Sequence, residues 1–218
     1  MIRQRWEAWL ERSRLNPAGL LRMRWPSISP EDREAFARLM ASTPDGGEIE
    51  YDLPHPKWIF LHHLVRSGYL LHGTNEPSIE KFRTRRGRDA HGRPIDAVFA
   101  TDDAIWPLYF AVVRREGLDH GYINWCVHVG DESRYLFSVG RDPRSDEAWT
   151  DGAIYVLPGE TFTPTRASRE LTSLVPVRPR ARLPVEPDDF PFRSRTLRHG
   201  AGSTPATVVR RVALTRHR

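Results

Sequence analysis

The sequence predicts an α+β fold, in which a helical N-terminal region precedes a mixed or antiparallel β-sheet core. Two observations carry this prediction. Helix signals gather in the first third of the chain, whereas the remainder holds short segments rich in β-branched and aromatic residues, separated by turns. Helices followed by a run of strands are typical of α+β proteins, because βαβ units would alternate the two. The 218 residues are enough for one full-sized core.

The helix signals are clearest at two places. Ser29 can cap a helix over Pro30–Met40, whose first turn carries proline and acidic residues that favour the positive end of a helix. A second helix is predicted from Pro56, with apolar residues recurring on one face until Gly68 stops it. Residues 3–25 also space their Trp and Leu residues as a helix would.

Strand-like segments dominate the rest of the chain. Tyr69–Gly73 and Ala97–Thr101 read as short buried strands. The second is followed by a predicted helix over Ala104–Arg114, which Asp102 or Asp103 can cap. Composition predicts further strands at 124–129, 135–139, 153–157, 171–177 and 207–214.

Arginine supplies almost all of the positive charge. The formal net charge is +5, and Lys57 and Lys81 are the only lysines. A planar guanidinium suits phosphate recognition, although a high-GC genome also favours arginine without any functional reason. The segment Lys81–Pro94, predicted as a loop, concentrates arginines from Arg83 to Arg93, and no acidic residue follows Asp189. Loop and tail together predict a surface for nucleic acid; the tail can equally be a solvated end.

Several classes of protein and of site are disfavoured by the sequence. Cys126 is the only cysteine, so no intramolecular disulfide forms, and no stretch approaches the roughly 20 apolar residues that cross a bilayer. We therefore expect a cytoplasmic protein without a membrane partner. There is no P-loop, no Gly-x-Gly-x-x-Gly after a strand, no zinc spacing and no Gly-x-Ser-x-Gly. His62-His63 point apart on a helix, so no metal site is expected.

The tripeptide His72-Gly73-Thr74 is the leading candidate for a site of chemistry. It lies where a buried strand is predicted to emerge, so two side-chain donors flank a glycine whose backbone a flat polar ligand can approach closely. The alternative interpretation is an ordinary corner between a strand and a turn.

The order of the neighbouring motifs favours the first interpretation. His72-Gly73-Thr74 precedes Val98-Phe99-Ala100-Thr101, then Tyr109-Phe110, then Glu170-Leu171-Thr172-Ser173. This series resembles the ADP-ribosyltransferase superfamily, in particular its poly(ADP-ribose) polymerase-like branch. The resemblance spans Tyr69 to about Val177 and implies a split β-sheet fold. Phe99 departs from the tyrosine usual in that branch, and the Glu-x-Glu or Gln-x-Glu pair of arginine-modifying relatives is absent.

The resemblance also implies roles for individual residues. NAD would be the co-substrate: His72 would bind the adenosine ribose, while Gly73 and Thr74 would hold the nicotinamide amide edge. Phe99 and Tyr109 would flank the nicotinamide ring. Glu170 would bind the nicotinamide ribose and steady the positive charge that develops on the sugar, an electrostatic role that suits an oxocarbenium-like transition state. Two other carboxylates compete with Glu170 for that role, namely Glu160 and Glu147.

These inferences define a predicted organisation and function. Residues 1–50 would form a helical lead-in packed on the core, 51–192 a catalytic domain, and 193–218 a basic tail or final strand. The predicted activity is transfer of ADP-ribose from NAD to a macromolecule, with nucleic acid as one candidate acceptor, or hydrolysis of NAD as a toxin would do. Two alternatives remain open: an NAD-dependent RNA 2′-phosphotransferase, and a non-enzymatic nucleic-acid-binding module.

Overall fold

The structure confirms the predicted α+β class. It is a computed structural model that describes residues 20–88, 93–118, 120–129, 132–140, 145–164 and 170–208. The chain divides into two compact units, each described here by itself and each built around its own β-sheet. The larger unit comprises Trp25–Val113 and Trp149–Pro191, and the smaller comprises the described residues of Met1–Arg24, Arg114–Ala148 and Phe192–Arg218. The predicted division at 50 and 192 stays a prediction.

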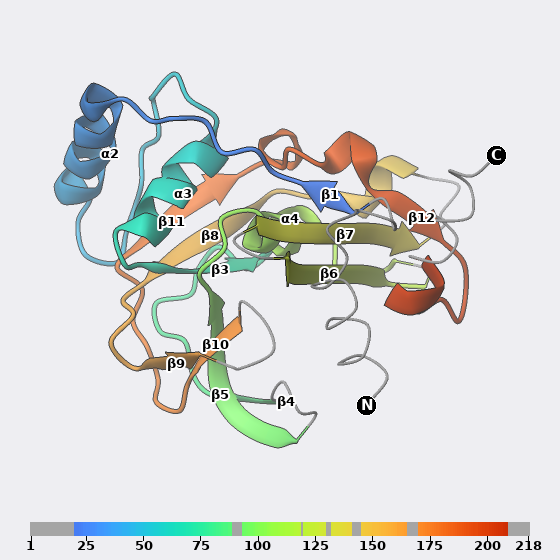
Figure 1. Cartoon of the computed structure of the whole chain (residues 1–218). Helices are drawn as coiled ribbons and strands as arrows, with labels where there is room; N and C mark the ends of the chain where they lie inside the picture. Colours follow the sequence, from blue (N-terminus) through green and yellow to red (C-terminus); the bar gives the residue numbers. More distant parts are fainter. Residues whose placement is uncertain are drawn as a thin grey trace. The chain divides into compact units, whose positions relative to one another are not determined.

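The larger unit holds an eight-stranded sheet with the order β2-β11-β8-β3-β5-β10-β9, and β4 pairs with β5. The sheet is mixed, because β2 runs parallel to β11 whereas the other pairs are antiparallel. Figure 1 shows β5 as a long, strongly curved arrow. The strands are β2 (Gly47–Glu48), β3 (Leu70–Thr74), β4 (Arg85–Arg88), β5 (Pro94–Thr101), β8 (Gly152–Leu157), β9 (Phe162–Pro164), β10 (Glu170–Ser173) and β11 (Ala181–Val185).

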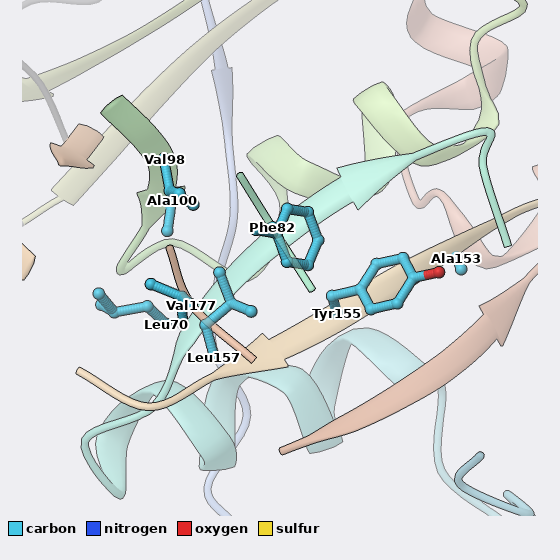
Figure 2. Close-up of a cluster of buried hydrophobic side chains, with 8 residues drawn as sticks. All are labelled: Leu70, Phe82, Val98, Ala100, Ala153, Tyr155, Leu157 and Val177. Carbon is cyan, nitrogen blue, oxygen red and sulfur yellow. The ribbon is translucent and has the colours of Figure 1, made fainter. Parts of the chain in front are cut away.

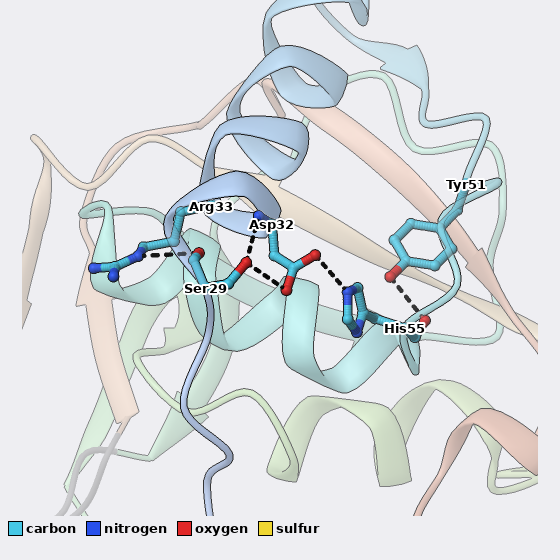
Figure 3. A network of polar contacts seen from close by, with 5 residues as sticks. All are labelled: Ser29, Asp32, Arg33, Tyr51 and His55. Carbon is cyan, nitrogen blue, oxygen red and sulfur yellow. Dashed lines mark hydrogen bonds and ion pairs between the residues drawn. The ribbon is translucent and has the colours of Figure 1, made fainter.

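The first two described helices follow the sequence prediction closely. α2 spans Pro30–Ser42, and the Ser29 hydroxyl accepts a hydrogen bond from the Asp32 amide at 3.0 Å, as a cap does. The Asp32 carboxylate in turn lies 2.8 Å from Nε2 of His55 (Figure 3). α3 spans Lys57–Arg66 and ends before Gly68, whose φ of +93° is the left-handed conformation that glycine adopts readily.

Helix α4 (Trp106–Val112) is shorter than the predicted Ala104–Arg114. Asp103 supplies the predicted cap: its Oδ1 accepts from the backbone amides of Ile105 and Trp106, each at 2.8 Å. The chain leaves the helix at Val113, which pairs with Trp149 in an isolated β-bridge, and this pairing replaces a further helical turn.

One face of the large sheet carries a hydrophobic cluster, shown in Figure 2. Tyr155 and Leu157 of β8 pack there beside Leu70 of β3, and Phe82 and Val177 cover them. The backbones of Phe82 and Val177 form a bridge, with both N–H···O distances at or below 3.0 Å. The cluster therefore ties the segment between β3 and β4 to the sheet.

The smaller unit is a four-stranded sheet centred on β7 (Glu132–Gly140). β6 (Tyr122–Val129) follows β7 along its whole length, so β1 (Leu21–Arg22) and β12 (Leu197–His199) share the other edge of β7. Its short 3-10 helices are η1 (Ser145–Ala148) and η3 (Arg193–Arg195), and η2 (Pro187–Asp189) belongs to the larger unit.

The structure corrects several predictions of local structure. The segment Lys81–Pro94, predicted as a loop, contains β4, which pairs with β5 from Arg85↔Ala97 to Arg88↔Pro94. The predicted strand 171–177 begins one residue earlier, at Glu170, and ends at Ser173. Residues 207 and 208 of the predicted strand 207–214 belong to a helical turn over 205–208, and the remainder of that strand lies outside the described residues.

The described residues include only the end of the helix predicted over residues 3–25. Most of the predicted helical segment 3–25 lies outside the described residues, and its end forms strand β1 instead. None of the described helices combines the length with the apolar character that a membrane span requires.

Candidate active site

The two edges of β3 are paired very differently. Toward β8 the ladder is continuous, from Leu70↔Leu157 to Thr74↔Ala153. Toward β5 the ladder consists of the single pair Leu71↔Thr101. Because both strands continue past that pair, β3 and β5 diverge at His72-Gly73-Thr74. The tripeptide that the sequence singled out therefore lies where the sheet opens.

His72 bridges this opening with its side chain. Its Nδ1 lies 2.7 Å from the carbonyl oxygen of Phe99. If the Leu71↔Thr101 register continued, Phe99 would lie opposite Gly73, so the imidazole takes the place of a ladder hydrogen bond. A carbonyl only accepts, so Nδ1 carries the proton, and in the neutral ring Nε2 is then a hydrogen-bond acceptor. An acceptor of this kind suits a sugar hydroxyl.

The imidazole of His72 is held in place by aromatic packing. Its ring centroid lies 4.8 Å from that of Phe82, and the Phe82 ring lies 5.1 Å from that of Tyr155, both in edge arrangements. The Tyr155 hydroxyl accepts from the Ile79 amide at 2.8 Å and donates to the Glu76 carbonyl at 3.1 Å. Burial raises the pKa of Tyr155, so the hydroxyl stays protonated and keeps donating. The loop after β3 is thereby fixed over His72.

Glu170 begins β10, the strand on the other side of β5. It lies opposite Thr101, which itself lies opposite Leu71, so the three residues form one row across β3, β5 and β10. The Glu170 side chain is partly buried and shares the sheet face of Thr101 and Leu71, whereas strand alternation turns His72 to the other face. The sequence predicted this residue, and the structure places it two strands from His72.

The two competing carboxylates are both exposed, whereas Glu170 is partly buried. Glu160 is exposed in the turn before β9, whose Phe162 pairs with Ser173 at the far end of β10 from Glu170. Ser173 is three residue steps along the strand from Glu170, which is about 10 Å at the usual rise. Glu147 is exposed in η1 and belongs to the smaller unit.

Phe99 lies on β5 with its ring against β4. A Cβ placed on Gly87 would come within 2.5 Å of the Phe99 Cζ atom, so the ring lies directly over the glycine. The ring is partly buried, and the backbone of the same residue binds His72. Phe99 thus links the diverging strands on one side and the β4–β5 pair on the other.

Gly73 and Thr74 are held by the neighbouring backbone. A Cβ on Gly73 would overlap the carbonyl oxygen of Pro107 in α4, so the position requires glycine because a helix packs on it. The sequence predicts a different reason for glycine at this position, namely the close approach of a ligand to the backbone. Thr74 is 8% exposed, and its hydroxyl accepts from the Glu76 amide at 3.2 Å.

Tyr109 lies on α4, outside the strands that carry the other predicted site residues. It is fully buried, with its ring centroid 5.6 Å from that of Phe190 and 6.3 Å from that of Trp149. Pro107 and Ala111 of α4 face Gly73, and Tyr109 is about 200° around the helix from Pro107. Its predicted stacking on nicotinamide therefore gains no support from its position.

The tandem histidines have structural contacts. The His62 ring stacks on Trp25 at 3.9 Å, and the His63 ring lies 5.4 Å from Phe36. Burial, followed by the charge of Arg33, lowers the pKa of His63. No cluster of three or more His, Cys, Asp or Glu residues suited to a metal occurs among the described residues.

Sequence reasoning missed two residues that shape the site. Phe82 carries the packing of His72, and Gly87 makes room for the Phe99 ring. Neither stands in a recognisable motif, and Gly87 lies between arginines in a segment whose composition indicates a loop. Their positions depend on pairing with other segments, Phe82 with Val177 and Gly87 with Ile95, which no local pattern encodes. Comparisons with protein-family models, with curated proteins and with solved structures found no match.

Proposed function

We propose that this chain is an NAD-dependent ADP-ribosyltransferase whose site lies along β3, β5 and β10. The observation that carries the proposal is the arrangement around the opening between β3 and β5. His72, Phe99 and Glu170 come from three neighbouring strands, although they are far apart in the sequence, and His72 binds the Phe99 backbone directly. The order of the residues is the one that the superfamily resemblance implies, with Phe99 in place of the usual tyrosine.

The residues present fit NAD. The acceptor nitrogen of His72 suits a ribose hydroxyl, and an aromatic face such as that of Phe99 attracts a flat pyridinium ring. The carboxylate of Glu170 stabilises positive charge that develops on the nicotinamide ribose. In the reaction the bond from the ribose C1′ to the pyridinium nitrogen breaks, and its electron pair leaves with neutral nicotinamide. The acceptor nucleophile bonds to C1′ and releases its proton; water as acceptor gives hydrolysis.

Nicotinamide release from labelled NAD tests the proposal. Glu170→Gln keeps the size of the side chain but removes its charge, and we expect the rate to fall about 100- to 1,000-fold. Glu160→Gln is the matched control and should retain the wild-type rate, because Glu160 lies just before β9, whose Phe162 pairs with Ser173 at the other end of β10 from Glu170. Release that survives both His72→Ala and Glu170→Gln would overturn the site assignment. Loss of activity in Glu160→Gln alone would move the catalytic role to that carboxylate.

Binding of NAD separates this proposal from a purely structural role of the tripeptide. If NAD binds only the folded chain, it stabilises that chain by about 2.7 kcal/mol at 100 times its dissociation constant. A thermal melt without any shift on adding NAD, together with no nicotinamide release, would reject the enzymatic function.

A further inference from the structure

We infer that the β4–β5 hairpin is a nucleic-acid-binding arm that presents the acceptor to the site described above. The role of the bound nucleic acid as ADP-ribose acceptor rests on the proposed function. The binding of nucleic acid to the hairpin does not depend on NAD. The hairpin is formed by Arg85–Arg88 paired with the first half of β5, and Arg83 stands two residues before it.

The charge of the hairpin is exposed and largely uncompensated. Arg83, Arg85 and Arg86 are all exposed, and among the described residues none of the three has an ion pair. Asp96, opposite Arg86 on β5, is the only acidic residue on the two described strands. Two other arginines of the larger unit are paired, since Arg180 lies 3.0 Å from Asp45 and Arg182 binds Glu48. Unpaired arginines on a paired ribbon indicate a polyanionic partner.

The hairpin is directly connected to the candidate site. Arg85 pairs with Ala97, and strand alternation puts Arg85 on the same side of the ribbon as Ala97 and Phe99. The Phe99 ring lies over Gly87 between the arginines, while the Phe99 carbonyl binds His72. Arg86, opposite Asp96, lies on the other side of the ribbon, so a nucleic acid that contacts all three arginines reaches both sides and follows β5 toward the opening between β3 and β5.

The geometry and chemistry favour nucleic acid over an anionic membrane. A two-stranded ribbon fits the major groove of a duplex, and it can equally follow the backbone of a single strand. The guanidinium fork matches phosphate oxygens bidentately, and the described hairpin carries no exposed large apolar side chain that would enter a bilayer.

Fluorescence anisotropy with a labelled oligonucleotide of mixed sequence, as single strand and as duplex, tests the inference. The triple variant Arg83→Gln/Arg85→Gln/Arg86→Gln should bind the single strand about 100-fold more weakly at about 0.1 M salt, because each lost phosphate contact removes about 0.7 log units there. The slope of log K against log salt should become shallower by about 2. Circular dichroism and thermal melting establish that the variant is folded.

The matched control removes the same charge from another part of the unit. Its substitutions are Arg33→Gln, Arg38→Gln and Arg66→Gln, all at exposed positions on α2 and α3. We expect the control to bind nearly as the wild type does. Equal losses in the two triple variants would show a general charge effect and overturn the inference. Absence of oligonucleotide binding by the wild type, or tighter binding to vesicles of anionic lipid, would also overturn it.

The outcome is separable from that of the proposed function. Oligonucleotide binding that depends on the hairpin, in a protein that never releases nicotinamide, would support the arm and reject the transferase. Nicotinamide release without hairpin-dependent binding would support the transferase and reject the arm.

Discussion

The two edges of β3 show how one short strand combines rigidity with an opening. On the edge toward β8, backbone pairs with backbone over the whole strand, and on the sheet face over this β3–β8 pair α4 packs so closely that Gly73 and Gly152 have no room for a Cβ. On the edge toward β5, one ladder pair is followed by a side-chain hydrogen bond from His72 and by aromatic contacts.

This difference predicts which substitutions should lower the stability of the larger unit and which should change the candidate site. A backbone atom of a packed helix cannot move without breaking hydrogen bonds, whereas an aromatic ring can shift to a new position. Changes at the β8 edge should therefore unfold the larger unit, and changes at the β5 edge should alter the candidate site while the unit stays folded.

The largest effect is expected at the β8 edge. In Gly73→Ala the added Cβ would overlap the Pro107 carbonyl oxygen, so α4 must move from β3. We expect the free energy of unfolding, measured by urea denaturation, to fall by more than about 3 kcal/mol. Gly200→Ala is the control, because its Cβ would meet open space and its stability should change by no more than about 0.5 kcal/mol. A tolerated Gly73→Ala would contradict the close packing of α4.

The attachment of α4 provides the second test. Asp103 is 4% exposed, and its Oδ1 accepts from two backbone amides at the start of the helix. Asp103→Ala leaves both donors without that partner and should cost about 1–2 kcal/mol in urea unfolding. Asp52→Ala, at an exposed position, should change stability by less than about 0.5 kcal/mol. Equal effects of the two substitutions would show that Asp103 does not anchor the helix.

The same contrast explains what could be predicted from the sequence. Ser29 with Pro30, the stop at Gly68 and the cap at Asp103 are local signals, and the structure confirms all three. The order of the motifs predicts His72, Phe99 and Glu170 as site residues, and the three occur on neighbouring strands. The sequence did not predict β4, because arginine and glycine favour a loop locally and only the curved partner β5 makes the segment a strand. The motif predicts Tyr109 as a site residue, but the position of a residue around the helix axis depends on how α4 packs, and Tyr109 lies on the side of α4 away from Gly73.

At the β5 edge we expect a smaller loss of stability and a larger change in the site. Gly87→Ala brings a Cβ against the end of the Phe99 side chain, which can rotate away, so the cost should be about 1 kcal/mol. The chemical shifts of the Phe99 ring should move, and nicotinamide release should fall. In a Phe99→Leu background the same Gly87→Ala substitution should leave the free energy of unfolding almost unchanged. If Gly87→Ala lowers the free energy of unfolding equally in the wild-type and Phe99→Leu backgrounds, the ring does not lie over Gly87.

The smallest effect is expected at the polar network of α2, which touches neither edge of β3. Hydrogen bonds from His55, then from Ser29, hold the pKa of Asp32 below its usual range (Figure 3). A lowered carboxyl pKa means that the folded chain binds the proton more weakly than the unfolded chain. The stability that Asp32 contributes is therefore complete above the usual carboxyl pKa and is lost as the pH falls through the lowered value.

His55→Phe tests this network, because it keeps a ring beside Phe36 and removes the donor to Asp32. An NMR titration of the Asp32 carboxyl carbon should show its pKa rising toward the usual value, with the Ser29 hydrogen bond retaining part of the shift. Because Asp32 is exposed to solvent, unfolding at neutral pH should barely change, and nicotinamide release should match that of the wild type. An unchanged Asp32 titration would assign the lowered pKa to Ser29 alone. A loss of nicotinamide release would show that the helices and the opening beside β3 are coupled, and the separation of stability from function at β3 would then fail.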